Sequence, residues 1–336
     1  MKNELILMAH GSGGAMSQRL VDEIFKPALA NQYLNEMLDG AVIDITAGRL
    51  AVSTDSFVIS PTIFPGGDIG KLSVCGTVND LVACGATPRY LTAGFILEEG
   101  YPLEELKAVV NSMAATAARV GVKLVAGDTK VVEKGSADRI FINTTGIGTI
   151  KDGIEYHPRR ITPGDVIIVT GTIGDHGLAI MAQREGLKFA TPVVSDCAPL
   201  YAIGEVLQGF TPAVKCLRDP TRGGLATVLN ELTAQSGAGM LVKETALPVQ
   251  STVAGACEML GMDPWYMANE GKMVIIAARE QSESILGALK AVDYGKDAAI
   301  IGEVVDKPAK TVLIETELGA CRILGVLEGE HLPRIC

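Results

Sequence analysis

Residues 151–163 constrain the fold of this chain most strongly, because they separate two halves that each mix strands and helices. The segment contains Pro158, Pro163 and charges of both signs, and its apolar residues follow no period. Apolar patterns in the first half predict strands at 42–45, 50–54, 57–60, 90–97, 123–126 and 140–150 and helices at 15–38, 69–84 and 103–120. Those in the second half predict strands at 165–170, 240–242, 273–277 and 298–304 and helices at 176–184, 223–236, 252–260 and 283–291. This order predicts an α/β (α+β mixed) protein with two lobes.

The domain bounds follow from this break and from the length of 336 residues, which suits two domains of ordinary size. We expect a glycine-rich loop and an N-terminal helical segment at 1–40, an N-terminal domain at 41–150 and a C-terminal α/β domain at 164–309. Residues 310–336 are expected to form a strand or two and then a tail. Gly85 and Gly121 should end two of the predicted helices.

The composition excludes several classes of protein. Hydrophobic residues make up 48% of the chain but aromatic residues only 4%, so the cores must be aliphatic. A net charge of -10 argues against a general nucleic-acid binder, which would carry a basic face. Seven cysteines without a CxxC pair indicate neither a zinc knuckle nor a disulfide framework. The apolar stretch at the start is too short for a signal peptide, so we expect a cytoplasmic protein.

The last residue, Cys336, is a candidate covalent carrier. A thiol at the end of a chain should be exposed and mobile, and exposure favours the nucleophilic thiolate. It could therefore swing into a site or out to a partner. The alternative is a frayed tail that ends in cysteine by chance.

Three aspartates at strand or helix edges are candidate magnesium ligands: Asp55 in STDS, Asp80 in VNDL and Asp128 in AGDTK. Magnesium on a nucleotide needs one or a few carboxylates plus phosphate oxygens. Turn formation by Asp55 and Asp128 and an exposed helix position for Asp80 are the alternatives. Lys130 could stabilise an oxygen on which negative charge builds up, or it could be a surface lysine.

Other motifs suit anions or acid–base chemistry. The loop Gly11-Ser12-Gly13-Gly14 could wrap phosphates with its backbone N–H groups, although it matches neither Walker A nor GxGxxG. The motif RDPTRGG at 218–224 precedes a helix, which suits an anion or equally a solvated helix cap. Glu270 in NEGK could act as a base near a mobile thiol, or belong to an ordinary charged turn. His10 and His176 are isolated, and His176 is expected in a structural turn.

Taken together, FPGGDIGKL, GTVNDLVACGATPRYLTAGFILEEG, GDTKVV, RDPTRGG, ANEGK and the closing PRIC resemble the HypE family of hydrogenase maturation factors. The resemblance runs from the glycine-rich start to the last residue. The family is similar to a superfamily of ATP-using enzymes with aminoimidazole ribonucleotide synthetase, selenophosphate synthetase and thiamine monophosphate kinase. There is no cysteine before Cys75, so the nucleophile expected of a selenophosphate synthetase is absent from the N-terminal loop.

The resemblance implies a two-domain aminoimidazole ribonucleotide synthetase-like fold, a homodimer through the N-terminal domains, and ATP with Mg²⁺ between the domains. It implies a carbamoyltransferase partner, HypF, that places a carboxamide on Cys336. ATP-dependent dehydration would turn this group into a thiocyanate, and the cyano group would pass to iron on a HypC–HypD complex for nickel–iron hydrogenase.

The implied roles fall on residues that match the motifs. The catalytic residues would be Cys336, Lys130 and Glu270. The ATP-binding residues would be Gly11, Ser12, Gly13, Gly14, Asp55, Lys71, Asn79, Asp80, Asp128, Thr129, Asp219, Arg222 and Gly223, with Asp55, Asp80 and Asp128 holding magnesium. Two rival hypotheses stay open: a non-enzymatic thiol carrier, and a small-molecule kinase of the same superfamily.

Overall fold

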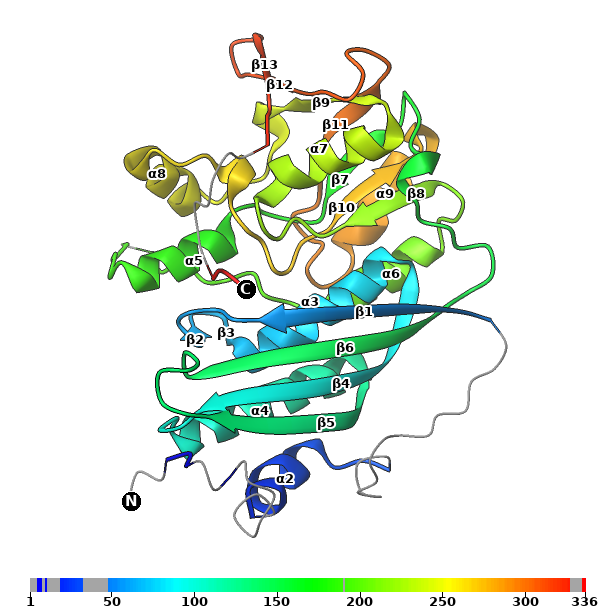
Figure 1. The fold of residues 1–336 in the computed structure, drawn as a ribbon. Coiled ribbons are helices and arrows are strands. Elements are labelled where there is room, and N and C mark those ends of the chain that lie inside the picture. The colour runs from blue at the N-terminus through cyan, green and yellow to red at the C-terminus, as the bar shows by residue number, and fades with distance from the viewer. Residues whose placement is uncertain (1–4, 8–9, 11–18, 33–47, 190, 327–333) are drawn as a thin grey trace.

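The structure is a computed structural model that describes residues 5–7, 10, 19–32, 48–189, 191–326 and 334–336. The first half is built on a four-stranded sheet in the order β1 (Arg49–Phe57), β6 (Ile140–Ile150), β4 (Ala86–Glu98), β5 (Lys123–Val132). Its pairs are antiparallel except β4 with β5. Helices α3 (Ile69–Ala83) and α4 (Leu103–Val120) cover one face (Figure 1). Shorter elements of this half are η2 (Val21–Phe25), α2 (Lys26–Leu29), β2 (Ile63–Phe64) and β3 (Gly67–Asp68).

Helix α3 is almost wholly buried, and its sequence explains its ends. The Asp68 carboxylate caps it by accepting hydrogen bonds from the N–H groups of Gly70 and Lys71, at 2.7 and 3.1 Å. A Cβ at Gly70 would lie 2.1 Å from the carbonyl oxygen of Val109, so only glycine lets α3 approach α4 this closely. Gly85, with φ +78°, follows its C-terminal end.

The second half is built on a seven-stranded sheet in the order β13 (Cys321–Ile323), β12 (Val312–Glu315), β9 (Gly239–Lys243), β11 (Ala299–Val305), β7 (Val166–Val169), β10 (Val274–Ala277), β8 (Val214–Arg218). Only β9 and β12 pair in parallel. Ile167 and Val169 pack with α7 (Gly224–Ser236), whereas Ile168 packs with α6 (Tyr201–Gln208) and α9 (Ser282–Lys290). Buried on both faces, β7 needs a continuous aliphatic sequence.

The remaining elements place the second half against α3. Val82 of α3 belongs to the same hydrophobic cluster as Ile203 of α6. Helices α5 (Asp175–Arg184) and α8 (Ser251–Leu260) pack together through Leu178 and Val253. Short 3-10 turns connect the elements: η4 (Pro158–Arg160), η5 (Glu244–Ala246), η6 (Pro264–Tyr266) and η7 (Arg279–Gln281). Within the described ranges, every helix is too short or too polar to cross a bilayer.

Most predicted elements are confirmed, and the differences have physical reasons. The strand predicted at 50–54 is confirmed as part of β1, which continues through the polar residues Asp55 and Ser56 to Phe57. The strand predicted at 57–60 is wrong beyond Phe57, because residues 58–60 lie outside any strand. Pro27 does not interrupt the predicted helix, because η2 runs directly into α2 and the helical backbone continues through Pro27 to Leu29. Helix α6 and strand β8 were not predicted. The strand at 42–45 and the loop 11–14 lie outside the described residues.

Candidate active site

Residues 334–336, called the tail below, lie between the two halves, beside α5 and just past the end of β1 (Figure 1). The N–H of Val58 donates a hydrogen bond to a main-chain carboxylate oxygen of Cys336 at 3.0 Å, and the N–H of Ser60 donates one to the carbonyl oxygen of Arg334 at 3.3 Å. The tail thus pairs with the segment after β1 much as one short strand pairs with another.

Side chains also hold the tail in place. Ile335 is 3% exposed and belongs to the hydrophobic core of the first half. Arg334 forms an ion pair with Asp138, and its guanidinium carbon lies 5.8 Å from the centre of the Phe141 ring. Arg184 of α5 donates a hydrogen bond to the Arg334 carbonyl. Buried apolar area and charge-assisted contacts therefore dock the tail from both halves of the chain.

Docking changes the chemistry of Cys336. Burial is the main cause that raises the pKa of the Cys336 thiol to about 12. The negative charge of Glu270, and after it those of Asp55 and Asp219, also raise this pKa, whereas the positive charge of Arg222 lowers it. The sequence led us to expect an exposed, mobile thiol, and the structure instead places a half-buried one. The expectation was wrong for this state because Ile335 anchors the tail in a core. The docked thiol is protonated and therefore a poor nucleophile.

Three carboxyl groups, called the acidic cluster below, influence one another near Cys336. Asp55 lies on β1, Asp80 lies on α3 and accepts a hydrogen bond from Ser53 Oγ at 2.6 Å, and Asp219 follows β8. Burial is the main cause that raises the pKa of each of the three carboxyl groups. The negative charge of Asp80 further raises the pKa of Asp55 and that of Asp219, and the pKa of Asp219 reaches about 7. Because these groups repel one another, either protonation or a bound cation would stabilise them.

A metal ion would need ligands besides these carboxylates. No group of three or more His, Cys, Asp or Glu side chains in the described ranges is placed to hold a metal ion by itself. Magnesium on a nucleotide needs only one or two carboxylates together with phosphate oxygens and water. The acidic cluster therefore suits a metal–nucleotide complex better than a metal enclosed by protein.

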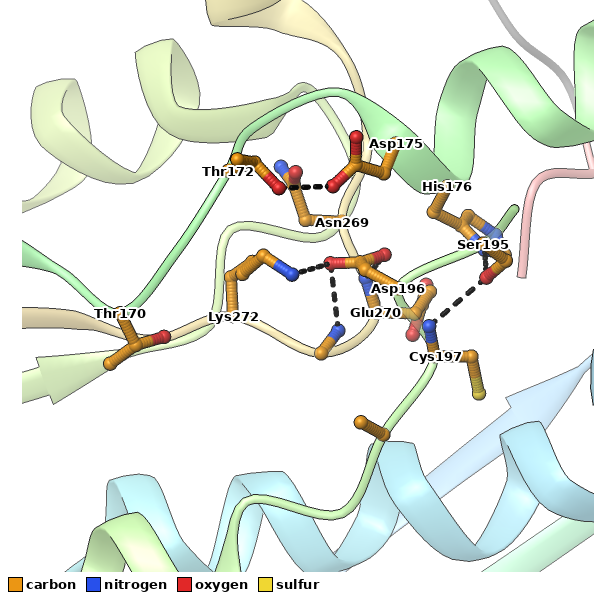
Figure 2. A network of polar contacts seen from close by, with 12 residues as sticks. Thr170, Thr172, Asp175, His176, Ser195, Asp196, Cys197, Asn269, Glu270 and Lys272 are labelled. Atoms are coloured by element: carbon orange, nitrogen blue, oxygen red, sulfur yellow. Dashed lines mark hydrogen bonds and ion pairs between the residues drawn. The ribbon is translucent and has the colours of Figure 1, made fainter. Parts of the chain in front are cut away.

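Glu270 lies in a turn that Asp196 holds in place. Asp196 accepts hydrogen bonds from the N–H groups of Glu270 and Gly271, at 3.1 and 3.2 Å, and forms an ion pair with Lys272 at 3.2 Å (Figure 2). A Cβ at Gly271 would lie 1.9 Å from the Asp196 carbonyl oxygen, so glycine permits the close approach. Burial, then the charge of Cys197, raises the pKa of the Glu270 carboxyl well above its usual value, and its Oε1 has no hydrogen-bond partner. Such a carboxyl is suited to proton transfer.

Two other residues predicted to bind ATP use their side chains in protein contacts. Asn79 donates to the carbonyls of Ala198 and Glu270, at 3.1 and 3.4 Å, and accepts from the N–H of Leu200 at 2.8 Å. It thereby joins α3 to the second half. Lys71 donates to the carbonyl of Gly66 at 2.7 Å.

The motif before α7 contributes one end of the site. Arg222 is exposed, and its charge acts on Cys336 and Asp55. Gly223 is the residue preceding α7, with φ +72°, and a Cβ there would lie 2.1 Å from Thr227 Oγ1. Glycine is therefore required to start the helix at this position.

The predicted residues Asp128, Thr129 and Lys130 are not brought to the acidic cluster within one chain. Asp55 on β1 and Gly127 on β5 are aligned across the sheet through the paired residues of β6 and β4, so they lie on the same face. Asp128, the next residue along β5, therefore points to the opposite face. Three strand spacings also separate β1 from β5, roughly 14 Å. The Asp128 and Lys130 side chains are 68% and 66% exposed and pair with each other at 3.0 Å. Thr129 is half-buried, and the predicted loop Gly11-Ser12-Gly13-Gly14 lies outside the described residues.

Several site residues had no recognisable signal in the sequence. A cavity of about 560 Å³ between the halves is lined by residues that include Thr170, Asp175, Asp196, Cys197 and Lys272. Among the described residues that the sequence analysis assigned to the site, Lys71 alone lines this cavity. Lys272 belongs to the ANEGK motif, so the motif was a sequence signal for its buried ion pair with Asp196. The segment around Asp196 has no motif, and its place becomes evident only in the folded chain.

Comparison with known proteins identifies the family. The family described as AIR synthase related protein, N-terminal domain, matches residues 37–150, and the corresponding C-terminal domain matches residues 162–315. The carbamoyl dehydratase HypE of Azotobacter vinelandii is 48% identical over 100% of this chain and 98% of its own length. The chain is a member of the HypE family of carbamoyl dehydratases.

Solved HypE structures share the fold described above. One, described as the hydrogenase maturation protein HypE in complex with ATP, has a TM-score of 0.95 at 48% identity and covers 98% of this chain and 99% of its own. A chain from a HypE–HypF complex has a TM-score of 0.82 at 51% identity and covers 94% and 100%. The predicted HypE membership and the mixed α/β fold class are both confirmed.

Proposed function

We propose that this chain uses ATP to dehydrate an S-carbamoyl group on its own Cys336 to a thiocyanate. The cyano group would then supply a ligand for the iron of nickel–iron hydrogenase. The docked tail carries this proposal, because it holds Cys336 within the electrostatic reach of Glu270, Asp55 and Asp219. Membership in a family of carbamoyl dehydratases, one of them solved with ATP, supports the reaction type and the nucleotide.

The difficulty of the reaction is the leaving group, since an amide oxygen cannot leave as oxide. Transfer of the γ-phosphoryl group of ATP to the carbamoyl oxygen would turn it into phosphate, which leaves readily. Such a transfer depends mainly on positioning and charge neutralisation. The docked tail would supply the positioning, and the buried Ile335 beside the thiol would help to keep water from the phosphorylated intermediate.

Protons must leave the carbamoyl nitrogen as the carbon–nitrogen triple bond forms. We assign one of the two protons to the ionised form of Glu270, whose buried carboxyl has a raised pKa and is therefore the stronger base, and the other to the departing phosphate. Asp196 and Lys272 hold the turn that presents it. Asn79 fixes the same turn from α3 through the carbonyl of Glu270.

Asp55, Asp80 and Asp219 would hold magnesium against the phosphates of ATP. When bound, the ion would neutralise charge on the transferring phosphoryl group. The mutual repulsion of these carboxyls supports a site for a cation. Arg222, at the edge of this cluster, would contact the nucleotide.

Lys130 and Asp128 can take part only if a second copy of the chain brings them to the site, because they lie on the far face of their own sheet. We propose a homodimer through this face. Its exposed apolar side chains support a buried interface there, with Val52 65% exposed and Ile96 43% exposed.

Two kinds of partner follow from the chemistry. A carbamoyltransferase such as HypF must load Cys336, and the solved HypE–HypF complex supports this pairing. A HypC–HypD complex would accept the cyano group. All seven cysteines are free thiols in the structure, which suits the reducing cytoplasm.

Intact-mass analysis tests the proposal in two steps. Incubation with the carbamoyltransferase, carbamoyl phosphate and ATP should add one carbamoyl group, or the cyano group formed from it, to the wild type and to Cys321→Ala, an exposed-cysteine control, but neither group to Cys336→Ala. ATP added to isolated carbamoylated protein should then remove the mass of one water and release ADP and phosphate. A stable carbamoyl adduct under ATP would favour a passive carrier, and ATP turnover on a diffusible substrate without change of the adduct would favour a kinase.

A further inference from the structure

His176 connects the tail to the second half of the chain through both of its ring nitrogens. Nε2 lies 2.7 Å from the carbonyl oxygen of Ile335. Nδ1 lies 2.7 Å from Ser195 Oγ (Figure 2). A carbonyl oxygen only accepts hydrogen bonds, so Nε2 must carry the proton. In the neutral ring Nδ1 then accepts from the Ser195 hydroxyl. Burial lowers the pKa of His176 and favours this neutral form.

The surrounding contacts leave the ring little freedom. Ser195 Oγ accepts a hydrogen bond from the N–H of Cys197 at 3.0 Å, so its own proton is directed to Nδ1. The imidazole also packs edge-on against Phe64, with ring centres 5.6 Å apart. His176 itself is fully buried. A single tautomer and orientation of the ring are therefore fixed in the docked state.

We propose that His176 is a positioning residue, with Ser195 fixing its tautomer, that holds the tail by the peptide carbonyl directly before Cys336. The inference rests on the proposed function, in which the docked tail is the form that reacts. The carbonyl is one peptide away from the thiol, so the bond sets both how often and in which orientation Cys336 occupies the site.

This role predicts different effects on the two half-reactions. Carbamoylation by a partner enzyme needs the tail undocked, so weakening the His176 bond should not slow it. Dehydration needs the tail docked, so the same change should slow it. A merely structural role for His176 would instead lower the melting temperature and reduce both half-reactions.

The test measures how fast iodoacetamide modifies Cys336 relative to Cys321, an exposed cysteine far from the tail. Cleavage after Glu330 by a glutamate-specific protease releases residues 331–336 for quantification by mass spectrometry. His176→Phe removes both ring nitrogens and should speed modification about tenfold, as expected for loss of one buried hydrogen bond. His176→Gln keeps an N–H donor at the Nε2 position and should restore most of the protection.

Two further variants keep the test decisive. Ser195→Ala removes the hydroxyl that holds His176 in one tautomer and should speed modification of Cys336 a few-fold. This variant tests the proposal independently if His176→Phe folds poorly. His157→Phe makes the same substitution at an exposed histidine and should change nothing. Unchanged Cys336 protection in folded His176→Phe, or equal loss of protection in the Phe and Gln variants, would overturn the role of His176. These outcomes do not depend on ATP, so they differ from failure of the proposed dehydration, which would leave the protection pattern intact.

Discussion

The ion pair between Lys272 and Asp196 should be among the most costly to break, because both side chains are removed from water. They lie 3.2 Å apart and are 11% and 3% exposed. Replacing Lys272 with methionine keeps most of the side-chain volume and leaves the Asp196 carboxylate buried without its counter-charge. Loss of one partner of a buried pair typically costs about 3–5 kcal/mol. Asp196 keeps its two backbone hydrogen bonds, so we expect the lower end, about 3 kcal/mol.

The matched control is the exposed pair between Arg119 and Asp293, whose side chains are 49% and 67% exposed. Arg119→Met should cost at most about 1 kcal/mol, since solvent screens such pairs. For a domain of this size, about 3 kcal/mol lowers the melting temperature by roughly 6–12 °C. The double variant Lys272→Met/Asp196→Asn should recover part of the loss, because the uncompensated charge is then absent.

Thermal unfolding followed by circular dichroism, in parallel with urea titration, measures all three variants. A Lys272→Met protein that unfolds at the same temperature as Arg119→Met would refute the argument that burial sets the cost. A double variant less stable than Lys272→Met alone would show that the Asp196 hydrogen bonds, and not its charge, dominate.

Three further predictions concern the tail, the acidic cluster and pH. Ile335→Ala removes about 2 kcal/mol of apolar burial from the tail and should speed iodoacetamide modification of Cys336 by up to roughly 30-fold; an unchanged rate would mean that Ile335 does not anchor the tail. Asp80→Asn should weaken magnesium-dependent ATP binding in calorimetric titration while the melting temperature stays within a few degrees, and unchanged affinity would count against a metal role. Burial lowers the pKa of His176 in the folded chain, so below about pH 6.5 the unfolded chain binds more protons than the folded one. The stability that neutral His176 contributes is therefore complete above about pH 6.5 and declines as the pH falls below it. The fall in urea midpoint between about pH 7.5 and 5.5 should therefore be smaller in His176→Gln than in the wild type, and identical slopes would contradict this assignment.

The sequence predicted the parts of the fold that depend on local patterns. Helix α4 was predicted over its observed range because its apolar residues repeat every three or four positions and Gly121 ends it. Helix α6 was missed because it has only eight residues, too few for a clear period. Asp55 was placed after a strand and lies within one, since the polar run 53–56, which alternates between the two faces of β1, resembled a turn. The domain bounds stay a prediction.

The site was only partly predictable for a different reason. Residue type and resemblance singled out Cys336, Glu270, Asp55 and Asp80, which the fold brings near one another through contacts between distant segments. The same reasoning could not place Asp128 on the opposite face, because that depends on the register of four strands. His176 was expected in a structural turn, and its bond to Ile335 joins positions 159 residues apart.

The most direct test of the account follows one oxygen atom. Protein carbamoylated on Cys336 with an isotopically heavy carbonyl oxygen is mixed with ATP, and the released inorganic phosphate is analysed by mass spectrometry. If the γ-phosphoryl group is transferred to that oxygen, the heavy atom must appear in the phosphate as the cyano group forms. Heavy oxygen found in water, with unlabelled phosphate, would contradict the account.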